Sequence, residues 1–557
     1  MSVVKEMNTA LHVRWLGTVP YSEALAIQNS IFRHGIDNRL LLLEHPHVFT
    51  YGPSADLEKN LLCDPQAVGA DFVSVKRGGD ITYHGPGQLV GYPLLTLPSK
   101  HGGDGPADST GYVHQVEQVV IDSLHEIGLT NAARFDGYPG VWLDVDSRPR
   151  KICAIGVRVS RRRTMHGFAV NVHTDLDYMT TNIVPCGIAD YPVTSIEAEG
   201  IDISMAAFVD VVAKHAAQAW GNGIMERQDV AWKQTPDDLS AFSRGEGPGQ
   251  PVRMLGRLAR AGVTESISLS ERKPDWIRPH VNHGEDVLQL KKTLRDLSLV
   301  TVCEEAGCPN LSECWSDGTA TFMVLGERCT RACGFCLVDT RKPEEPDAHE
   351  PARVADAVMK MGLSFAVLTM VARDDLDDEG MGHIAQCVRA IRERDPKIKV
   401  ETLISDARGT ASLDLILNER PDVLNHNMET VPRLQRAVRP SAGYARSLSV
   451  LARAKAAGLT VKSGLIVGMG ETDDEIVGVL ADLAAVGVDI VTIGQYLRPT
   501  TNHLPVARWV EPEVFDMYKQ VGEAFGIGHV ESSPLTRSSY HAKESEARAV
   551  PVTIGVR

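Results

Sequence analysis

The stretch GERCTRACGFC, from Gly326 to Cys336, places three cysteines at spacings of four and three residues. A structural zinc site ordinarily takes four ligands, most often as two spaced pairs, and no fourth cysteine closely follows this stretch. A second group lies just upstream in CEEAGCPNLSEC, which contributes Cys303, Cys308 and Cys314. Such clustering in a large chain favours metal binding over a disulfide framework.

The chain around these cysteines alternates between short apolar, β-branched runs and amphipathic helical stretches. The expected strands are residues 320–326, 365–371, 399–404, 422–427, 460–468 and 489–496. The clearest helical stretches between them are residues 351–362, 383–395 and 472–487. This alternation predicts a parallel sheet with right-handed crossovers, here a partial (β/α)6 TIM barrel with its chemistry where the strands end. Cys329 follows the first strand, where such a site is expected.

Three thiolates can hold a cubane iron–sulfur cluster by three of its irons, which leaves the fourth iron open to another ligand. The spacing of Cys329, Cys333 and Cys336, with Phe335 before the last cysteine, resembles the signature of the radical S-adenosylmethionine superfamily. The resemblance implies a 4Fe–4S cluster whose open iron binds S-adenosyl-L-methionine, which is then cleaved to a 5′-deoxyadenosyl radical. The alternatives are a zinc site and chance clustering.

The second triad has spacings of five and six residues, and RSSYHA (Arg537–Ala542) lies near the end of the chain. Together with KPDWIRP (Lys273–Pro279), HNMETVPRLQRAVRP and TIGQYLRPTTNHLPV, these motifs resemble the lipoyl synthase family. The resemblance implies a second 4Fe–4S cluster that is consumed as the sulfur donor. Its ligands would be Cys303, Cys308, Cys314 and Ser539, with Ser538 as the fallback. An oxygen ligand suits sulfide-rich iron less well than a thiolate, so an iron held in this way could leave.

Several positions depart from the family's usual residues, and these put local substrate or cofactor contacts in doubt: Met370, Ala372, Ser405, Ala407 and Ser533. The acidic run from Asp374 to Glu379 is expected to be a solvated loop.

Three blocks follow one another in the N-terminal half: KRGGDITYHGPGQLVGYPLL from Lys76, RKICAIGVRVSRRRTMHGFAVNV from Arg150 and NIVPCGIADYPVTSI from Asn182. The first is rich in glycine but lacks the phosphate-loop pattern. Together they resemble the octanoyl–acyl carrier protein:protein octanoyltransferase family, which implies the α+β fold of biotin and lipoate protein ligases. The resemblance implies that Cys186 carries an acyl thioester and that Lys151 favours its thiolate form. It also implies an acyl pocket made by Arg77, Gly78, Gly79, Asp80, Ile81, Thr82, Tyr83, His84, Ala154, Ile155, Gly156, Gly167, Phe168 and Ala169.

The chemistry of a cysteine and a lysine suits this assignment. Moving an acyl group from a thioester to an amine needs a nucleophile that both accepts and releases the group, and a thiolate does both. A nearby ammonium favours the thiolate, and the same lysine, once neutral, can take a proton from the attacking amine. A lone cysteine is otherwise more often a small buried apolar residue, and this remains the interpretation for Cys63, Cys153 and Cys387.

If both resemblances hold, the two halves catalyse consecutive steps of protein lipoylation. The implied partners are octanoyl-acyl carrier protein, the lipoyl domains of 2-oxoacid dehydrogenase E2 subunits and of glycine cleavage H protein, and a reductant such as ferredoxin or flavodoxin. Two alternatives remain for the N-terminal half. It could be an ATP-dependent lipoate ligase, which needs no nucleophilic cysteine, or a non-catalytic module that docks lipoyl domains.

Length and composition bound the remaining possibilities. The chain has 557 residues and a formal charge of −15, which argues against a nucleic-acid partner. We expect no membrane span, because the most apolar stretch, residues 476–494, is interrupted by Asp482 and Asp489. A cytoplasmic location follows by default. The expected domains are residues 1–228 and 269–557, joined by a linker at 229–268 that is rich in Gly, Pro and Arg.

Overall fold

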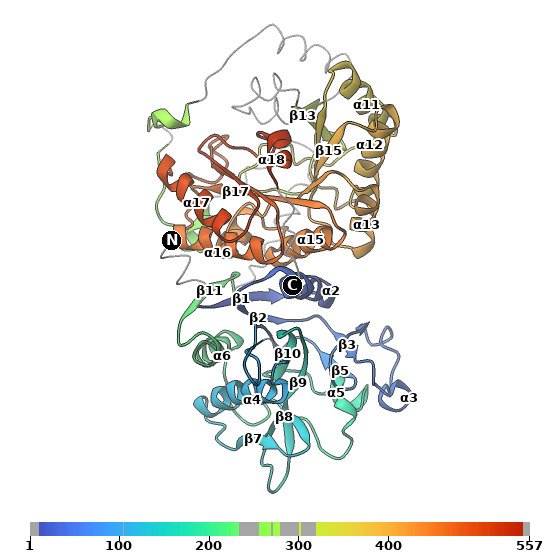
Figure 1. Cartoon of the computed structure of the whole chain (residues 1–557), viewed down its shortest axis with the longest axis vertical. Coiled ribbons are helices and arrows are strands. Elements are labelled where there is room, and N and C mark those ends of the chain that lie inside the picture. Colours follow the sequence, from blue (N-terminus) through green and yellow to red (C-terminus); the bar gives the residue numbers. More distant parts are fainter. Residues whose placement is uncertain are drawn as a thin grey trace. The chain divides into compact units, whose positions relative to one another are not determined.

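The computed structural model describes residues 10–103, 105–232, 255–268, 271–278, 300–301 and 319–549. The chain divides into two compact units, Met1–Trp232 and Lys233–Arg557 (Figure 1). Cys303, Cys308 and Cys314 lie outside the described residues.

The N-terminal unit is built on an eight-stranded sheet with the order β11-β1-β2-β6-β10-β9-β8-β7. Its strand β1 pairs in parallel with β2 and β11, and every other neighbouring pair is antiparallel. A mixed sheet of this kind agrees with the predicted α+β class. The strands are β1 (Leu11–Thr18), β2 (Asn38–Glu44), β6 (Gln88–Leu94), β7 (Ala132–Phe135), β8 (Tyr138–Leu143), β9 (Arg150–Ser160), β10 (Arg163–Asn171) and β11 (Met225–Asp229).

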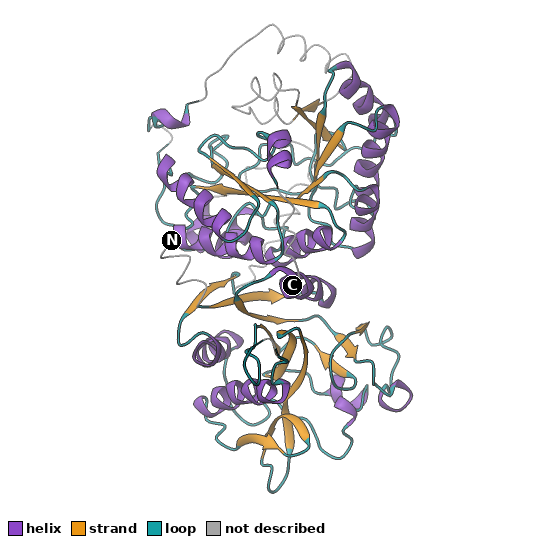
Figure 2. Ribbon diagram, viewed as in Figure 1, coloured by secondary structure: helices purple, strands orange, loops and turns teal. Residues whose placement is uncertain are grey.

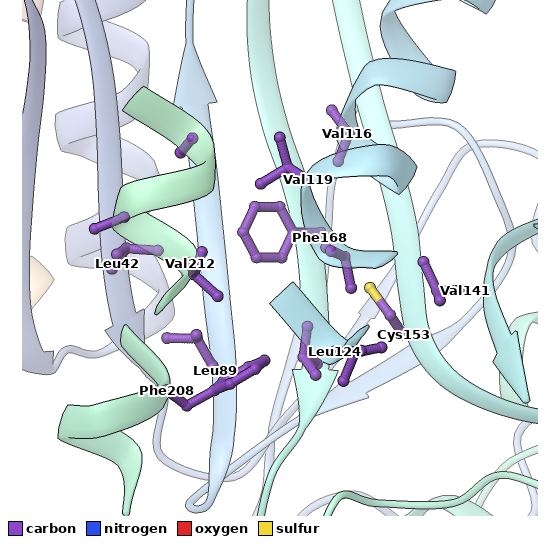
Figure 3. Close-up of a cluster of buried hydrophobic side chains, with 14 of the residues drawn as sticks. Leu42, Leu89, Val116, Val119, Leu124, Val141, Cys153, Phe168, Phe208 and Val212 are labelled. Carbon is purple, nitrogen blue, oxygen red and sulfur yellow. The ribbon is translucent and has the colours of Figure 1, made fainter. Parts of the chain in front are cut away.

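The core of this unit lies between the sheet and the helices α4 (Ser109–Glu126) and α6 (Met205–Trp220). Both helices begin at a capping side chain, since Asp108 accepts from the Gly111 amide and Ser204 from the Ala207 amide. Figure 3 shows side chains of the two helices meeting those of the sheet around the ring of Phe168. The helices thereby hold strands β9 and β10 in place.

A smaller sheet completes the N-terminal unit. Its order is β4-β3-β5, with β3 (Val48–Tyr51), β4 (Asp71–Ser74) and β5 (Thr82–His84). The remaining helical segments are α2 (Tyr21–His34), α3 (Leu57–Asn60), α5 (Asp177–Thr181) and the 3-10 turn η1 (Pro185–Gly187).

The C-terminal unit contains a second eight-stranded sheet, with the order β12-β13-β14-β15-β16-β17-β18-β19. All strands from β13 to β19 run parallel, and β12 pairs antiparallel with β13. The bounds are β12 (Val300–Thr301), β13 (Thr319–Val324), β14 (Phe365–Met370), β15 (Lys399–Leu403), β16 (Val423–Asn425), β17 (Thr460–Val467), β18 (Ile490–Gln495) and β19 (His529–Ser532).

Helices separate these parallel strands along the chain and surround the curved sheet (Figure 2). They are α11 (Glu350–Lys360), α12 (Met381–Arg394), α13 (Thr410–Glu419), α15 (Tyr444–Ala456), α16 (Asp473–Ala485) and α17 (Pro512–Ala524). Five shorter helical segments of the described residues lie outside this alternation: α7 (Leu255–Arg260), η3 (Asp275–Ile277), η4 (Pro432–Leu434), α14 (Gln435–Val438) and α18 (Ala542–Arg548). Within the described residues the sheet is open between β12 and β19, as the predicted partial barrel requires. The six expected strands are all present, and β19 adds a seventh parallel strand.

Both ends of the expected linker belong to folded structure. Strand β11 pairs with β1 as far as Asp229, and the ring of Trp232 stacks on Trp15 with centroids 4.3 Å apart. At the other end, Leu258 of α7 is buried, and the Ile267 amide donates to the Val506 carbonyl at 2.7 Å. The part of the chain between these two folded ends is therefore shorter than 229–268.

The most apolar stretch forms α16 and then β18, as expected. No helix among the residues that the structure describes combines the length and the hydropathy needed to cross a membrane.

Candidate functional site

The loop from Cys329 to Cys336 leaves the end of β13 and is fastened by backbone hydrogen bonds to three other segments. The Thr330 amide donates to the Ala372 carbonyl at 3.0 Å, just beyond β14. The Gly334 amide donates to the carbonyl of Val438 at the end of α14 at 2.8 Å, and its own carbonyl accepts from the Leu504 amide at 3.0 Å. The three predicted cluster ligands of this loop therefore lie on a backbone whose path is fixed from several sides.

Arg331, between the first two cysteines, anchors the loop by buried ion pairs. Its Nη2 and Nε atoms donate to the two carboxylate oxygens of Asp374 at 2.7 and 2.9 Å, and its Nη1 donates to Asp406. The side chains of Arg331 and Asp374 are each 5% exposed and that of Asp406 is fully buried. Arg331 holds the pKa of Asp406 down at about 2 although burial alone would raise it. The carboxylate therefore stays ionised at neutral pH.

The acidic run from Asp374 to Glu379 is not the solvated loop that the sequence suggested. Besides Asp374, the Asp378 carboxylate accepts from the Gly380 and Gly382 amides at the start of α12, both at 2.9 Å. The buried Glu379 accepts from the Arg408 amide at 2.9 Å. The expectation failed because Asp374 and Glu379 accept hydrogen bonds from the distant loop residues Arg331 and Arg408, which a charge run does not reveal.

The thiols of Cys329, Cys333 and Cys336 are free, and the Arg331 amide points at the Cys329 sulfur at 3.4 Å. Burial raises the pKa of Cys333 to about 11 and also raises the pKa of Cys329 and Cys336. Thiolates at these three half-buried positions need a positive partner, which iron supplies, and soft sulfur donors suit an iron–sulfur cluster. The residues present fit such a cluster. No group of three or more His, Cys, Asp or Glu side chains within the described ranges is arranged to hold a single metal ion.

A cavity of about 590 Å³ opens beside Cys336 at the carboxyl ends of the parallel strands. Phe335, Glu429 and Arg498 line it, together with Thr492 and Ser538. Glu429 has a φ of 66°, in the left-handed region that side chains other than glycine seldom adopt, and burial raises its pKa. Backbone strain of this kind is typical of functional positions.

The two candidate serines have different surroundings. The Ser538 hydroxyl accepts from the Asn427 Nδ2 atom at 2.7 Å and lines the cavity. Ser539 is half-buried, and no described residue forms a hydrogen bond with its hydroxyl.

The N-terminal unit contains a cavity of about 300 Å³, and most of the predicted acyl-pocket residues line it. Cys186 and Lys151, although distant in sequence, share this lining with residues of β5, β9 and β10. The lining positions that were predicted are Arg77, Gly78, Gly79, Asp80, Thr82, His84, Ala154, Ile155, Gly156, Gly167, Phe168 and Ala169.

Ile81 and Tyr83 were also expected to line the pocket, but they lie outside it, in a separate buried cluster with Phe49. Side chains alternate between the two faces of a strand, so Thr82 and His84 face the cavity while Tyr83 faces away. Ile81 still supports the site through its backbone, since its carbonyl accepts from the Cys186 amide at 2.9 Å.

Cys186 lies at the centre of the turn η1 with a φ of 57°, and Gly187 follows with a φ of 69°. Two successive left-handed residues form a tight turn, which Gly187 adopts without strain and Cys186 does not. The turn packs on β5, and the thiol is half-buried.

Two cationic side chains reach this cavity. The buried Arg77 guanidinium donates to the carbonyl and hydroxyl of Thr50 at 2.8 and 3.0 Å. The Nζ atom of Lys151 lies 5.2 Å from the ring centroid of Trp142. Burial lowers the pKa of His84 to about 3 and that of His166 to about 4, so both imidazoles are neutral at pH 7.

The sequence reasoning missed several lining residues, among them Tyr21, Tyr92 and His166. His166 directly precedes the predicted Gly167, so the same block could have indicated it. Tyr21 comes from α2, far from every block, and only the fold brings it to the cavity. The Nδ1 atom of His166 and the hydroxyl of Thr82 are buried without a hydrogen-bond partner among the described residues.

Three family profiles match the chain. The lipoyl protein ligase A/B catalytic domain matches residues 20–217, the N-terminal domain of lipoyl synthase matches residues 234–308, and the radical SAM superfamily matches residues 323–483.

Relatives of known name match the C-terminal part. The lipoyl synthase of Rubrobacter xylanophilus is 53% identical over 288 residues, which cover 51% of this chain and 90% of the relative. That of Chlorobium limicola is 52% identical over 277 residues, which cover 49% of this chain and 95% of the relative. Among solved structures, a bipartite lipoate protein ligase from Thermoplasma acidophilum is 18% identical with a TM-score of 0.33, covering 40% of this chain and 88% of that one.

We expect Asp406→Asn to destabilise the C-terminal unit by roughly 3 kcal/mol, because it leaves part of the buried Arg331 charge uncompensated. Urea unfolding of the full chain without iron should show an earlier transition for this unit. The exposed Asp377 provides the matched control, and Asp377→Asn should leave the transition unchanged. An equal midpoint for both variants would contradict the anchoring role of Asp406.

Proposed function

Through its C-terminal part the chain belongs to the lipoyl synthase family, and on this premise we propose that it is a bifunctional lipoylation enzyme. The N-terminal unit would transfer octanoyl from octanoyl-acyl carrier protein to a lysine of a lipoyl domain. The C-terminal unit would then insert sulfur at carbons six and eight of that chain. We place both reactions in the cytoplasm, with lipoyl domains of E2 subunits and H protein as acceptors.

The observation that carries the transferase proposal is the shape of the N-terminal cavity. Cys186 and Lys151 lie near Ala154 and Ala169, while Val157 and His166 line the cavity three residues further along the paired strands. Three residues of strand span about 10 Å. An extended eight-carbon chain reaches roughly 9 Å with staggered torsions, so its length suits a thioester on Cys186.

Lys151 would release and regain one proton during each cycle, while Cys186 would carry the octanoyl group. The Cys186 thiolate attacks the octanoyl thioester, and the carrier leaves as a thiol with the proton of the Lys151 ammonium. The lysine amine of the lipoyl domain then attacks the Cys186 thioester and gives its proton to Lys151. The amide forms, the Cys186 thiolate leaves, and the starting charges are restored.

In the C-terminal unit, Cys329, Cys333 and Cys336 would hold a 4Fe–4S cluster. When bound, this cluster supplies the electron that cleaves S-adenosyl-L-methionine to a carbon radical, with ferredoxin or flavodoxin as the reductant. The cavity beside Cys336 would admit the octanoyl-lysine, and its apolar lining residues Phe335 and Leu465 would exclude water. A second cluster on Cys303, Cys308, Cys314 and Ser539 would be the sulfur-donating substrate.

An ATP-dependent ligase remains the second candidate for the N-terminal unit, because the matched profile covers ligases as well as transferases. A ligase needs free acid and ATP and has no use for the strained Cys186. Transfer from octanoyl carrier protein without ATP, followed by the mass of the lipoyl domain, tests the choice.

We predict that Cys186→Ala lowers octanoyl transfer at least 100-fold, because no other thiol of the described residues lines the cavity of about 300 Å³ in the N-terminal unit. Sulfur insertion into a domain that already carries octanoyl should survive. Cys153 is buried in the core and provides the control, so Cys153→Ala should retain transfer. Wild-type transfer by Cys186→Ala would exclude the thioester route.

We predict about eight irons per chain after anaerobic reconstitution, as two 4Fe–4S clusters require. Alanine at Cys329, Cys333 and Cys336 should leave about four irons and abolish S-adenosylmethionine cleavage. Alanine at Cys303, Cys308 and Cys314 should leave cleavage and abolish sulfur insertion. Purified protein that contains zinc and takes up no iron would contradict both assignments.

We predict that Ser539→Cys loads iron normally but forms much less lipoyl product, since a thiolate releases iron less readily than an oxygen ligand. Ser538 is the matched neighbour, and its hydroxyl is already bonded to Asn427. Ser538→Ala should therefore be milder. Normal product from Ser539→Cys at equal iron loading would show that Ser539 is no ligand.

A further inference from the structure

Helix α7 brings a buried arginine to the cysteine loop from a segment that the sequence assigned to the linker. The Nη1 atom of Arg257 donates to the Ala332 carbonyl at 3.4 Å, and its charge acts on the neighbouring Cys333 thiol. Helix α7 packs against α14, to which the loop is also bonded through Gly334 and Val438. Arg257 thus lies against the loop on the side of Cys333.

The position of α7 is fixed by contacts on both sides of Arg257. Leu258 is buried, and the Ala261 carbonyl accepts from the Arg433 Nη1 atom at 2.7 Å. Val263 packs so closely on Gly470 that a Cβ there would lie 2.4 Å from a Val263 methyl carbon. The segment is therefore part of the C-terminal unit.

Arg257 is 6% exposed, yet its Nε and Nη2 atoms have no hydrogen-bond partner among the described residues. The other arginines near the loop are occupied. Arg331 pairs with Asp374 and Asp406, and Arg439 donates to the carbonyls of Asn427 and Met428. A buried guanidinium with free donors is costly unless a negative group faces it.

We propose that Arg257 is a positioning residue whose positive charge faces the cluster at Cys333 and makes that cluster easier to reduce. The inference rests on the proposed cluster site. A cubane on three thiolates carries net negative charge that increases on reduction, and nearby charge and donors to sulfur set its potential. A buried cation beside the cluster therefore stabilises the reduced form more than the oxidised form, because the reduced form carries more negative charge.

The test uses the full chain with Cys303, Cys308 and Cys314 changed to alanine, so that one cluster is observed. Its reduction is followed by electron paramagnetic resonance in a redox titration without S-adenosylmethionine. At the potential that reduces half of the wild-type cluster, Arg257→Gln should lower the ratio of reduced to oxidised cluster about tenfold. This change corresponds to a midpoint potential that is about 59 mV lower for a one-electron step. Arg257→Lys keeps the charge and should stay close to wild type. Arg260, exposed on the same helix, provides the control as Arg260→Gln.

An unchanged ratio in Arg257→Gln at equal iron content would overturn the inference. So would failure of both Arg257 variants to take up iron, which would make the residue structural. If only Arg257→Gln fails to take up iron, the midpoint potential of Arg257→Lys decides. A wild-type potential supports the role of the charge, and a tenfold lower ratio of reduced to oxidised cluster contradicts it. Absence of a cluster in the parent chain would instead refute the proposed function.

Discussion

The buried ion pairs of Arg331 with Asp374 and Asp406 are the constraint on which the C-terminal site depends. They join the cysteine loop to the ends of β14 and β15, so the path of the loop is set by the barrel. Buried pairs of this kind add little net stability, because desolvation offsets much of the Coulomb energy, but breaking one is costly. Their effect is to specify one arrangement of the loop that carries Cys329, Cys333 and Cys336.

The N-terminal site also fixes the position of its cysteine, but its described residues do so by other means than buried ion pairs. Its cysteine is held in a left-handed turn by the Ile81 carbonyl, and the strands β9 and β10 supply the cavity wall. Gly156 belongs to that wall for a steric reason, because a Cβ there would lie 3.1 Å from Arg77 Cδ. In both units a sheet positions the candidate cysteines on a short connection, as is common for functional residues that a fixed scaffold presents.

Local patterns predicted much of this arrangement, and the failures have identifiable causes. Apolar runs located the six strands and placed Cys329 after the first, because strand periodicity is a local property. Strand alternation could have excluded Tyr83 from the pocket, but the resemblance was carried over as a continuous block. Tyr21, the ion pairs of the acidic run and the docking of α7 depend on contacts between distant segments. No local pattern contains that information.

The two proposed sites share no residue, since all residues of one come from the first 232 positions and all of the other from beyond them. The joining of the two units in one chain therefore has no structural role within either proposed site. Under the proposed two-step reaction, the tether limits how far the second site lies from a lipoyl domain that has just left the first, which favours capture over diffusion into bulk solution. That advantage depends on the length of the connection, which the folded ends at Trp232 and α7 shorten. A shorter tether raises the local concentration as long as it still lets the domain reach both sites.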